Sequence, residues 1–179
     1  MIRARRLPRK RPGDAEGIQL ELGDDEFHFL QALPTRLREV LLDPESAPRV
    51  IDRLFPPAHE DAMEDAEHRR LLGRSLYHER LEALERYESS FQGAELDPLT
   101  DFHELTLGAA ELDVWLHVLN DLRLLIATEL DIRDNDWFEQ GPRNSEDAIR
   151  FQLLASLSAV QEILLAALMG GEGRTGSAG

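Results

Sequence analysis

Two segments of the chain follow one pattern: Leu20-Glu21-Leu22-Gly23-Asp24-Asp25-Glu26-Phe27 and Leu105-Thr106-Leu107-Gly108-Ala109-Ala110-Glu111-Leu112. In each, apolar residues alternate with polar ones, a glycine follows, and apolar residues then recur at helical spacing. Alternation is typical of a half-buried strand, and a spacing of three or four is typical of an amphipathic helix. The sequence therefore predicts two strand–glycine–helix units, over residues 18–42 and 103–127, as a pseudo-repeat around one core.

The predicted fold class is mainly α. We expect residues 18–22 and 103–107 to pair as a small two-stranded sheet. Residues 109–130 are apolar nearly all round, which favours a buried helix at the centre of a helical bundle. Pro34 interrupts the first helix, and proline inside a helix breaks or kinks it.

The remaining helices are predicted from their composition and from the residues at their ends. Residues 61–90 read as one long charged helix. Asn144 or Ser145 caps a last helix. The apolar residues of that helix lie on one face: Ile149, Leu153, Leu157, Val160, Leu164 and Leu168. The domain organisation is then a basic flexible arm over 1–13, a single helical domain over 14–170 and a disordered tail over 171–179.

Charge is distributed unevenly along the 179 residues, whose net charge is −15. The first twelve residues contain six basic side chains and no acid, which leaves 14 basic against 35 acidic residues in the remainder. The basic residues of the arm are Arg3, Arg5, Arg6, Arg9, Lys10 and Arg11. An acidic body repels nucleic acid, so only the arm could contact it, and a protein partner with a basic surface is the better match. The alternative for the arm is a solvated tail.

Compartment and chemistry are constrained mainly by what the sequence lacks. There is no cysteine, so disulfides and thiol redox chemistry are excluded. We find no signal peptide and no segment long and apolar enough to span a membrane, so we expect a cytoplasmic protein without membrane contact.

One polar strip on the predicted central helix is a candidate metal site. Asp113, His117 and Asp121 share a helix face, as ligands of a metal-dependent enzyme could. A solvated or hydrogen-bonded polar strip is the favoured interpretation. Motifs for a nucleophile or a phosphate-binding loop are missing. We therefore expect no catalytic residue, no cofactor and no metal.

Three segments together resemble the actinobacterial oxidative-stress regulator (AosR) family. They are Arg53-Leu54-Phe55-Pro56-Pro57-Ala58, Glu67-His68-Arg69-Arg70-Leu71, and Trp115-Leu116 followed by Leu119-Asn120-Asp121-Leu122-Arg123-Leu124. The resemblance runs from about residue 17 to residue 169, and the order and spacing of all three segments agree. The signature residues are Leu54, Phe55, Pro56, Arg69, Arg70, Trp115, Asn120, Asp121 and Arg123.

The resemblance implies a non-enzymatic regulator that acts in transcription through a protein partner, in a sigma-factor-like or adaptor role. The redox sensing ascribed to that family uses a cysteine pair, which this chain lacks, so the redox switch does not carry over. A direct DNA-binding regulator and a metal-dependent enzyme are the alternatives, and a homodimer through the first or last helix stays open.

The polar signature residues on the central helix have a structural interpretation as well. Half-buried polar side chains need hydrogen-bonding partners. Asp121 is only two residues from Arg123, which is a poor spacing for pairing on a helix. We therefore expect Arg123 to pair with a group elsewhere, such as a carboxylate on the long helix, and thereby to stabilise the fold.

Overall fold

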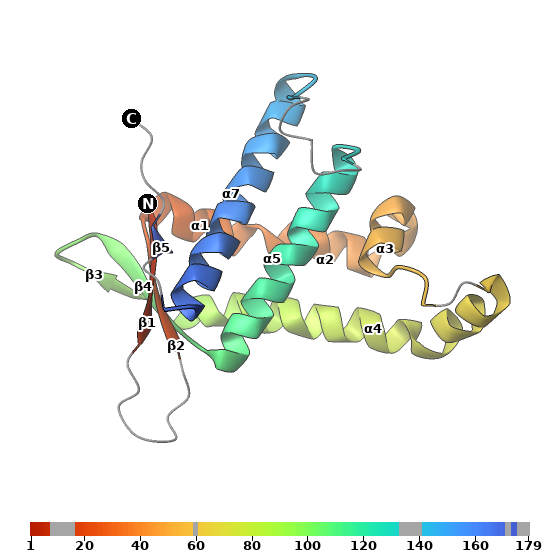
Figure 1. Cartoon of the computed structure of the whole chain (residues 1–179), viewed down its shortest axis with the longest axis horizontal. Coiled ribbons are helices and arrows are strands. Elements are labelled where there is room, and N and C mark those ends of the chain that lie inside the picture. The colour runs from red at the N-terminus through yellow and green to blue at the C-terminus, as the bar shows by residue number, and fades with distance from the viewer. Residues whose placement is uncertain (8–16, 59–60, 133–140, 171–172, 175–179) are drawn as a thin grey trace.

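The fold is described by a computed structural model that covers residues 1–7, 17–58, 61–132, 141–170 and 173–174 (Figure 1). Within the long helix, the side chains at 62, 65–66 and 68–72 lie outside this description. The molecule is mainly helical, with one antiparallel sheet at one end.

The sheet is larger than the sequence predicts. Its strands, in spatial order, are β3 (Glu95–Asp97), β4 (Phe102–Gly108), β2 (Gly17–Leu22), β1 (Ile2–Leu7) and the two-residue β5 (Gly173–Arg174). The predicted pairing of 18–22 with 103–107 is confirmed, with Leu20 opposite Leu105. The prediction of only two strands is wrong, because β3 extends the sheet beyond β4 and β1 extends it beyond β2.

Strand β1 corrects the prediction of a flexible arm. Ile2 and Ala4 are buried in the core, whereas Arg5 and Arg6 are exposed. In β1 the buried apolar residues Ile2 and Ala4 alternate with other residues, as in a half-buried strand. Two apolar positions are too few for this alternation to stand out in the sequence among so many arginines. Residues 8–13 of the predicted arm lie outside the described residues.

The predicted disordered tail is corrected in part. Residues 173–174 form β5, and Gly173 and Arg174 pair with Ala4 and Arg3 of β1. The rest of 171–179 lies outside the described residues.

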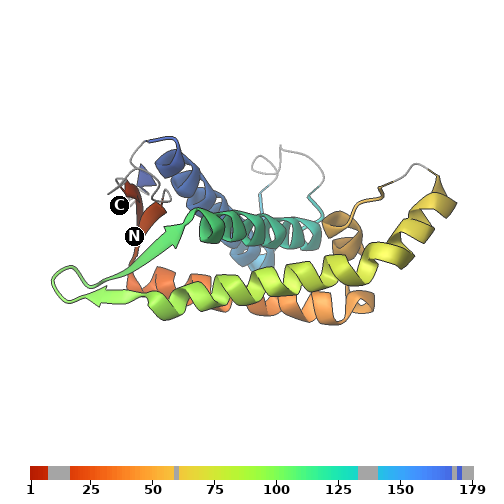
Figure 2. The same ribbon diagram turned by 90° about the horizontal axis from the view of Figure 1, so that it is seen from below.

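Six α-helices are described, and four of them pack against a fifth, α5. They are α1 (Asp24–Ala32), α2 (Pro34–Leu42), α3 (Pro48–Leu54), α4 (Ala62–Ser90), α5 (Ala109–Glu129) and α7 (Ser145–Leu168), with short 3₁₀ turns at Pro44–Ser46 and Phe91–Gly93. Helix α5 contacts α2, α3, α4 and α7, so the predicted central position of this helix is confirmed. Helix α4 runs alongside α1 and α2, and its N-terminal end projects beyond the other helices (Figure 2).

Pro34 ends the first helix as predicted. Helix α1 stops at Ala32, Leu33 keeps helical backbone angles, and α2 begins at Pro34 itself. Proline has no amide hydrogen to donate to the carbonyl four residues earlier, that of Leu30. The Tyr87 hydroxyl of α4 donates to this carbonyl instead, at 3.0 Å. The carbonyl left without a partner at the helix break therefore receives its hydrogen bond from another helix.

The two strand–glycine–helix junctions are alike in local geometry. Gly23 and Gly108 both have extended backbone angles before their helices. A Cβ atom there would lie 2.5 Å from the Glu26 carboxylate and 2.6 Å from that of Glu111, respectively. The units differ after this first turn, because Pro34 divides the first helical stretch and α5 continues without interruption.

An aromatic cluster fills the core between α4 and α5. The Trp115 ring centroid lies 4.7 Å from that of Tyr87 and 5.2 Å from that of Phe91. The Trp115 indole N–H donates to the Ser90 hydroxyl at 2.9 Å. Burial of rings of this size contributes strongly to stability, and the buried indole has its partner. Trp115 is thus a core residue.

Helix α7 corrects the prediction that no segment is long and apolar enough to span a membrane. Among the described residues it is the one helix long and apolar enough to cross a membrane, a criterion that core helices also meet. It packs against α5 and β1 in this structure.

Candidate functional site

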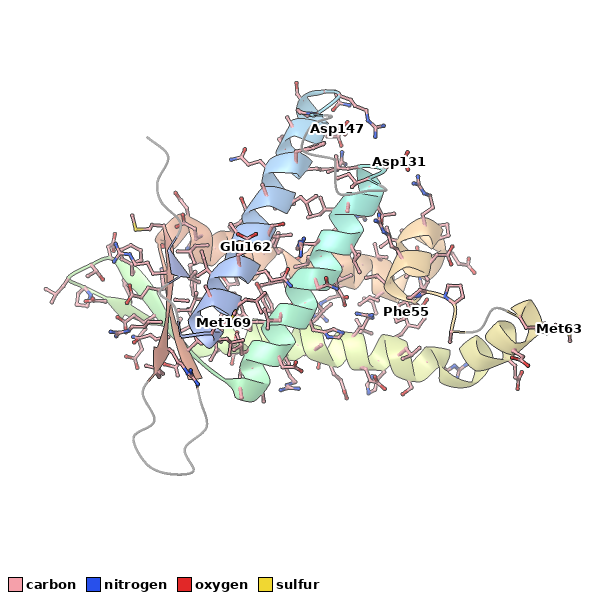
Figure 3. All side chains as sticks on the ribbon, viewed as in Figure 1. Phe55, Met63, Asp131, Asp147, Glu162 and Met169 are labelled. Atoms are coloured by element: carbon pink, nitrogen blue, oxygen red, sulfur yellow. The ribbon has the colours of Figure 1, made fainter. Side chains whose placement is uncertain are left out.

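The signature segments of α3 and α5 meet at an arginine of the long helix. Arg80 forms an ion pair with Asp121 of α5 and donates to the backbone carbonyl of Leu54 at 2.9 Å. Its guanidinium also lies over the Phe55 ring, 4.8 Å from the centroid. Phe55 in turn lies 4.6 Å from the ring of Tyr77, between the end of α3 and α4 (Figure 3). One cation therefore joins α3, α4 and α5.

The electrostatics of this pair are dominated by burial. Asp121 is only 4% exposed. Burial raises its pKa, and the charge and hydrogen bond of Arg80 act in the opposite direction, with a smaller effect from His117. A buried carboxylate is tolerated when it is paired and hydrogen-bonded. The arrangement therefore holds helices together and leaves Asp121 unavailable to a ligand.

The partner predicted for Arg123, a carboxylate on the long helix, is wrong. Arg123 donates to the side-chain oxygen of Gln161 on α7, at 2.5 Å, and its Nε is buried without a hydrogen-bond partner among the described residues. The ion pair with the long helix is made by Asp121, with a cation on α4 that sequence reasoning missed. The available signal was the buried position of Asp121 on an apolar helix, which requires a cation.

The other signature residues are placed as follows. Leu54 is buried, Pro56 is exposed two residues after the end of α3, and Asn120 is exposed on α5. Arg69 and Arg70 belong to α4, but their side chains lie outside the described residues. The signature is therefore divided between a core cluster and exposed positions.

The polar strip proposed as a metal site is not brought together. Asp113 and His117 are exposed on α5, whereas Asp121 turns inward to Arg80. In the described part of the chain, no group of three or more acidic, histidine or cysteine side chains is arranged to hold a metal ion.

The arginines of β1 have internal contacts. Arg3 lies over the Phe102 ring, 5.2 Å from its centroid, and 3.7 Å from the Glu21 carboxylate. Arg5 donates to the Gln19 side chain at 2.9 Å. Arg6 is exposed. Arg9, Lys10 and Arg11 lie outside the described residues.

An open groove runs between α1 and α7. One part has a volume of about 530 Å³ and is lined by Ile2 and Phe29 on one side and by α7 residues on the other. A second part, of about 400 Å³, continues toward α2. Both parts share Phe29 and Leu153, so they form one surface, which we call the α1–α7 groove. It is predominantly apolar, and sequence reasoning did not find it.

Comparisons with known proteins give one positive result. A family model described as "Domain of unknown function (DUF2017)" matches residues 4–168. No curated protein matches the chain. No solved structure matches it.

Proposed function

The chain belongs to the family of the domain of unknown function DUF2017, and from this premise we propose that it is a non-enzymatic regulatory protein. It acts in transcription by binding a protein partner, in a sigma-factor-like or adaptor role. The resemblance of its three signature segments to the AosR family supports this proposal. Because the chain has no cysteine, its regulation does not use a cysteine redox switch.

The observation that carries the proposal is the exposed apolar surface of α7. Helix α7 is long and apolar, yet most of the residues along it are only partly buried or exposed. Ile149 is 69% exposed at the mouth of the α1–α7 groove. Exposed apolar surface of this kind marks interaction sites, because leaving it in water is unfavourable. The net charge of −15 favours a partner with basic surface.

An affinity capture from nuclease-treated lysate tests the proposal. The full chain is compared with a variant carrying Arg5→Glu and Arg6→Glu, which reverses the exposed charges of β1 without deleting the strand. Retention of identified RNA polymerase or sigma-factor subunits by both proteins, reproduced with the purified subunits, would support a partner-binding regulator.

A parallel capture from lysate without nuclease treatment tests the direct DNA-binding alternative. Recovery of nucleic acid alone from untreated lysate, lost in the charge-reversed variant, would contradict the proposal. Binding that falls steeply with salt would accompany that outcome.

A further inference from the structure

Helix α7 carries a regular stripe that is covered at one end and open at the other. The stripe follows alternating steps of four and three residues: Ile149, Leu153, Ser156, Val160, Ile163 and Ala167. From Val160 onward it is buried, with Ile163 5% and Ala167 0% exposed, whereas Ile149 at its other end is 69% exposed. The open half extends away from the sheet (Figure 1). Steps of four and three are the repeat by which one helix packs along another.

The dimensions of the open half match a helix. Residues 149–160 of α7 span about 16 Å at 1.5 Å per residue, or roughly three turns. The opposite wall comes from α1, where Phe29 is half-buried and contributes to both parts of the groove. A groove between two apolar walls accepts the apolar face of an amphipathic helix.

We propose that the α1–α7 groove binds an amphipathic helix of a protein partner, with basic residues flanking its apolar face. The inference rests on the proposed function and specifies where the partner binds and by what chemistry. The apolar face of the partner helix continues the stripe of α7, and its basic flank faces the acids around the groove.

Acidic residues surround both ends of the groove. At one end, α1 begins with three consecutive acids, and Asp25 lines the groove without an ion-pair partner among the described residues. At the other end, Arg36 and Glu39 line the groove and belong to an ion-pair network of two guanidiniums and four carboxylates. The pairs there are Arg36 with Glu39 and Glu129, and Arg150 with Glu129, Glu146 and Asp147. The uncompensated charge at each end is negative, so a basic flank is favoured and an acidic one repelled.

The charge of the whole chain disfavours a second copy as the occupant. Two copies would each carry −15, and a symmetric contact through this groove would bring Asp25 and its equivalent onto the same interface. Like charges at an interface cost binding energy. Self-association is therefore an outcome that the test must detect.

A pair of synthetic peptides tests the occupant directly. Both are fluorescently labelled helices of four turns with leucines at steps of three and four, and they differ only in flanking lysines or flanking glutamates. Binding to the full chain is measured by fluorescence anisotropy at low and high salt. We expect the lysine peptide to bind, with an affinity that falls as salt screens the charges, and the glutamate peptide not to bind.

Matched variants locate the binding site. Ile149→Asp places a charge on the open stripe and should weaken binding of the lysine peptide by roughly tenfold or more. Leu165→Asp changes another exposed apolar residue of α7, 42% exposed and outside the groove lining, and should leave binding unchanged. Asp25→Lys should weaken the lysine peptide and allow the glutamate peptide to bind. Because both changed apolar residues are exposed, loss of fold does not explain a difference between them.

Several results would overturn the inference. These are equal peptide binding by Ile149→Asp and wild-type protein, preference for the glutamate peptide, or a wild-type dimer in sedimentation that Ile149→Asp dissociates. Retention of transcription subunits by Ile149→Asp would also overturn it while leaving the proposed function intact. Normal peptide binding with no subunit retained by any variant would instead contradict the proposed function and support the groove.

Discussion

At the scale of single residues, Tyr87 donates the hydrogen bond that Pro34 cannot donate. The Leu30 carbonyl lies four residues before an amino acid without an amide hydrogen, and the fully buried Tyr87 hydroxyl donates to it. Burial raises the pKa of Tyr87 well above its ordinary range, so the hydroxyl stays protonated and remains a donor. The break between α1 and α2 is thus fixed in place by α4.

Tyr87→Phe should therefore destabilise the protein by about 1–3 kcal/mol, because it leaves a buried carbonyl without a donor. Urea unfolding measures this change in the free energy of unfolding. Pro34→Ala supplies an amide hydrogen at the right position, so the cost of Tyr87→Phe should be smaller in that background. Equal costs in both backgrounds would show that the hydroxyl does not compensate for the proline.

Asp121 is the second residue whose removal should have a large effect. Asp121→Ala leaves the Arg80 guanidinium largely buried without its carboxylate, and breaking a buried pair from one side costs about 3 kcal/mol. Asp113→Ala, on the exposed side of the same helix, should change the free energy of unfolding by less than about 0.5 kcal/mol. Similar values for the two variants in urea unfolding would contradict the structural role assigned to the pair.

At the scale of elements, the turn between β3 and β4 is held by one carboxylate. Asp97 accepts hydrogen bonds from the Leu99 amide at 2.9 Å and the Thr100 hydroxyl at 2.7 Å. These bonds lower the pKa of Asp97, with the Leu99 amide as the largest cause. A lowered pKa means that the turn is stabilised at pH values above the ordinary aspartate pKa of about 4, and loses that contribution as pH falls through the lower folded value.

The Leu99 amide resonance should report this titration in NMR spectra. We expect its chemical shift to change with a midpoint below about 4, the ordinary pKa of aspartate. Asp97→Asn should remove the change while the strands remain paired. A midpoint at or above the ordinary value would show that the ionised carboxylate is not favoured in the folded turn.

Elements were predictable from sequence where local chemistry decides them. Pro34 marks a helix end by itself, and Asn144 caps α7 by accepting the Asp147 amide, one of the two caps proposed. Contacts between distant segments were not predictable in the same way. Arg80 and Asp121 are separated by 41 positions, and nothing local to either selects the other.

For the last helix, prediction from the sequence is limited in a different way. Its apolar residues were assigned to one face, and Leu157 and Leu164 are indeed buried, whereas Ile149 on that face is exposed. Periodicity identifies a face but does not say which part of its length is covered. The α1–α7 groove was missed for this reason.

At the scale of the whole molecule, β1 makes the N-terminal segment part of the core. It pairs with β2 along six residue positions and carries the buried Ile2 and Ala4. Deletion of residues 1–12 should therefore abolish the cooperative thermal transition in circular dichroism, because an apolar face and one edge of β2 lose their cover.

The charge-reversed variant Arg5→Glu and Arg6→Glu is the control for that deletion. It keeps the strand and alters only exposed side chains, so its free energy of unfolding should fall by less than about 1 kcal/mol. A cooperative transition retained by the deletion would mean that β1 is dispensable and that the predicted arm was the better description.

The order of strands also bears on how the chain folds while it is being made. The β1–β2 hairpin leaves the ribosome early, but Leu105, the partner of Leu20 on β4, comes 85 residues later. At ordinary synthesis rates of about 5–20 residues per second, one edge of β2 waits roughly 4 to 17 seconds for its neighbour. During this interval the nascent hairpin exposes unpaired amides and carbonyls that neighbouring chains can bind. Slow translation between α1 and α5 should therefore increase aggregation of this protein, and chaperones that hold extended segments should reduce it.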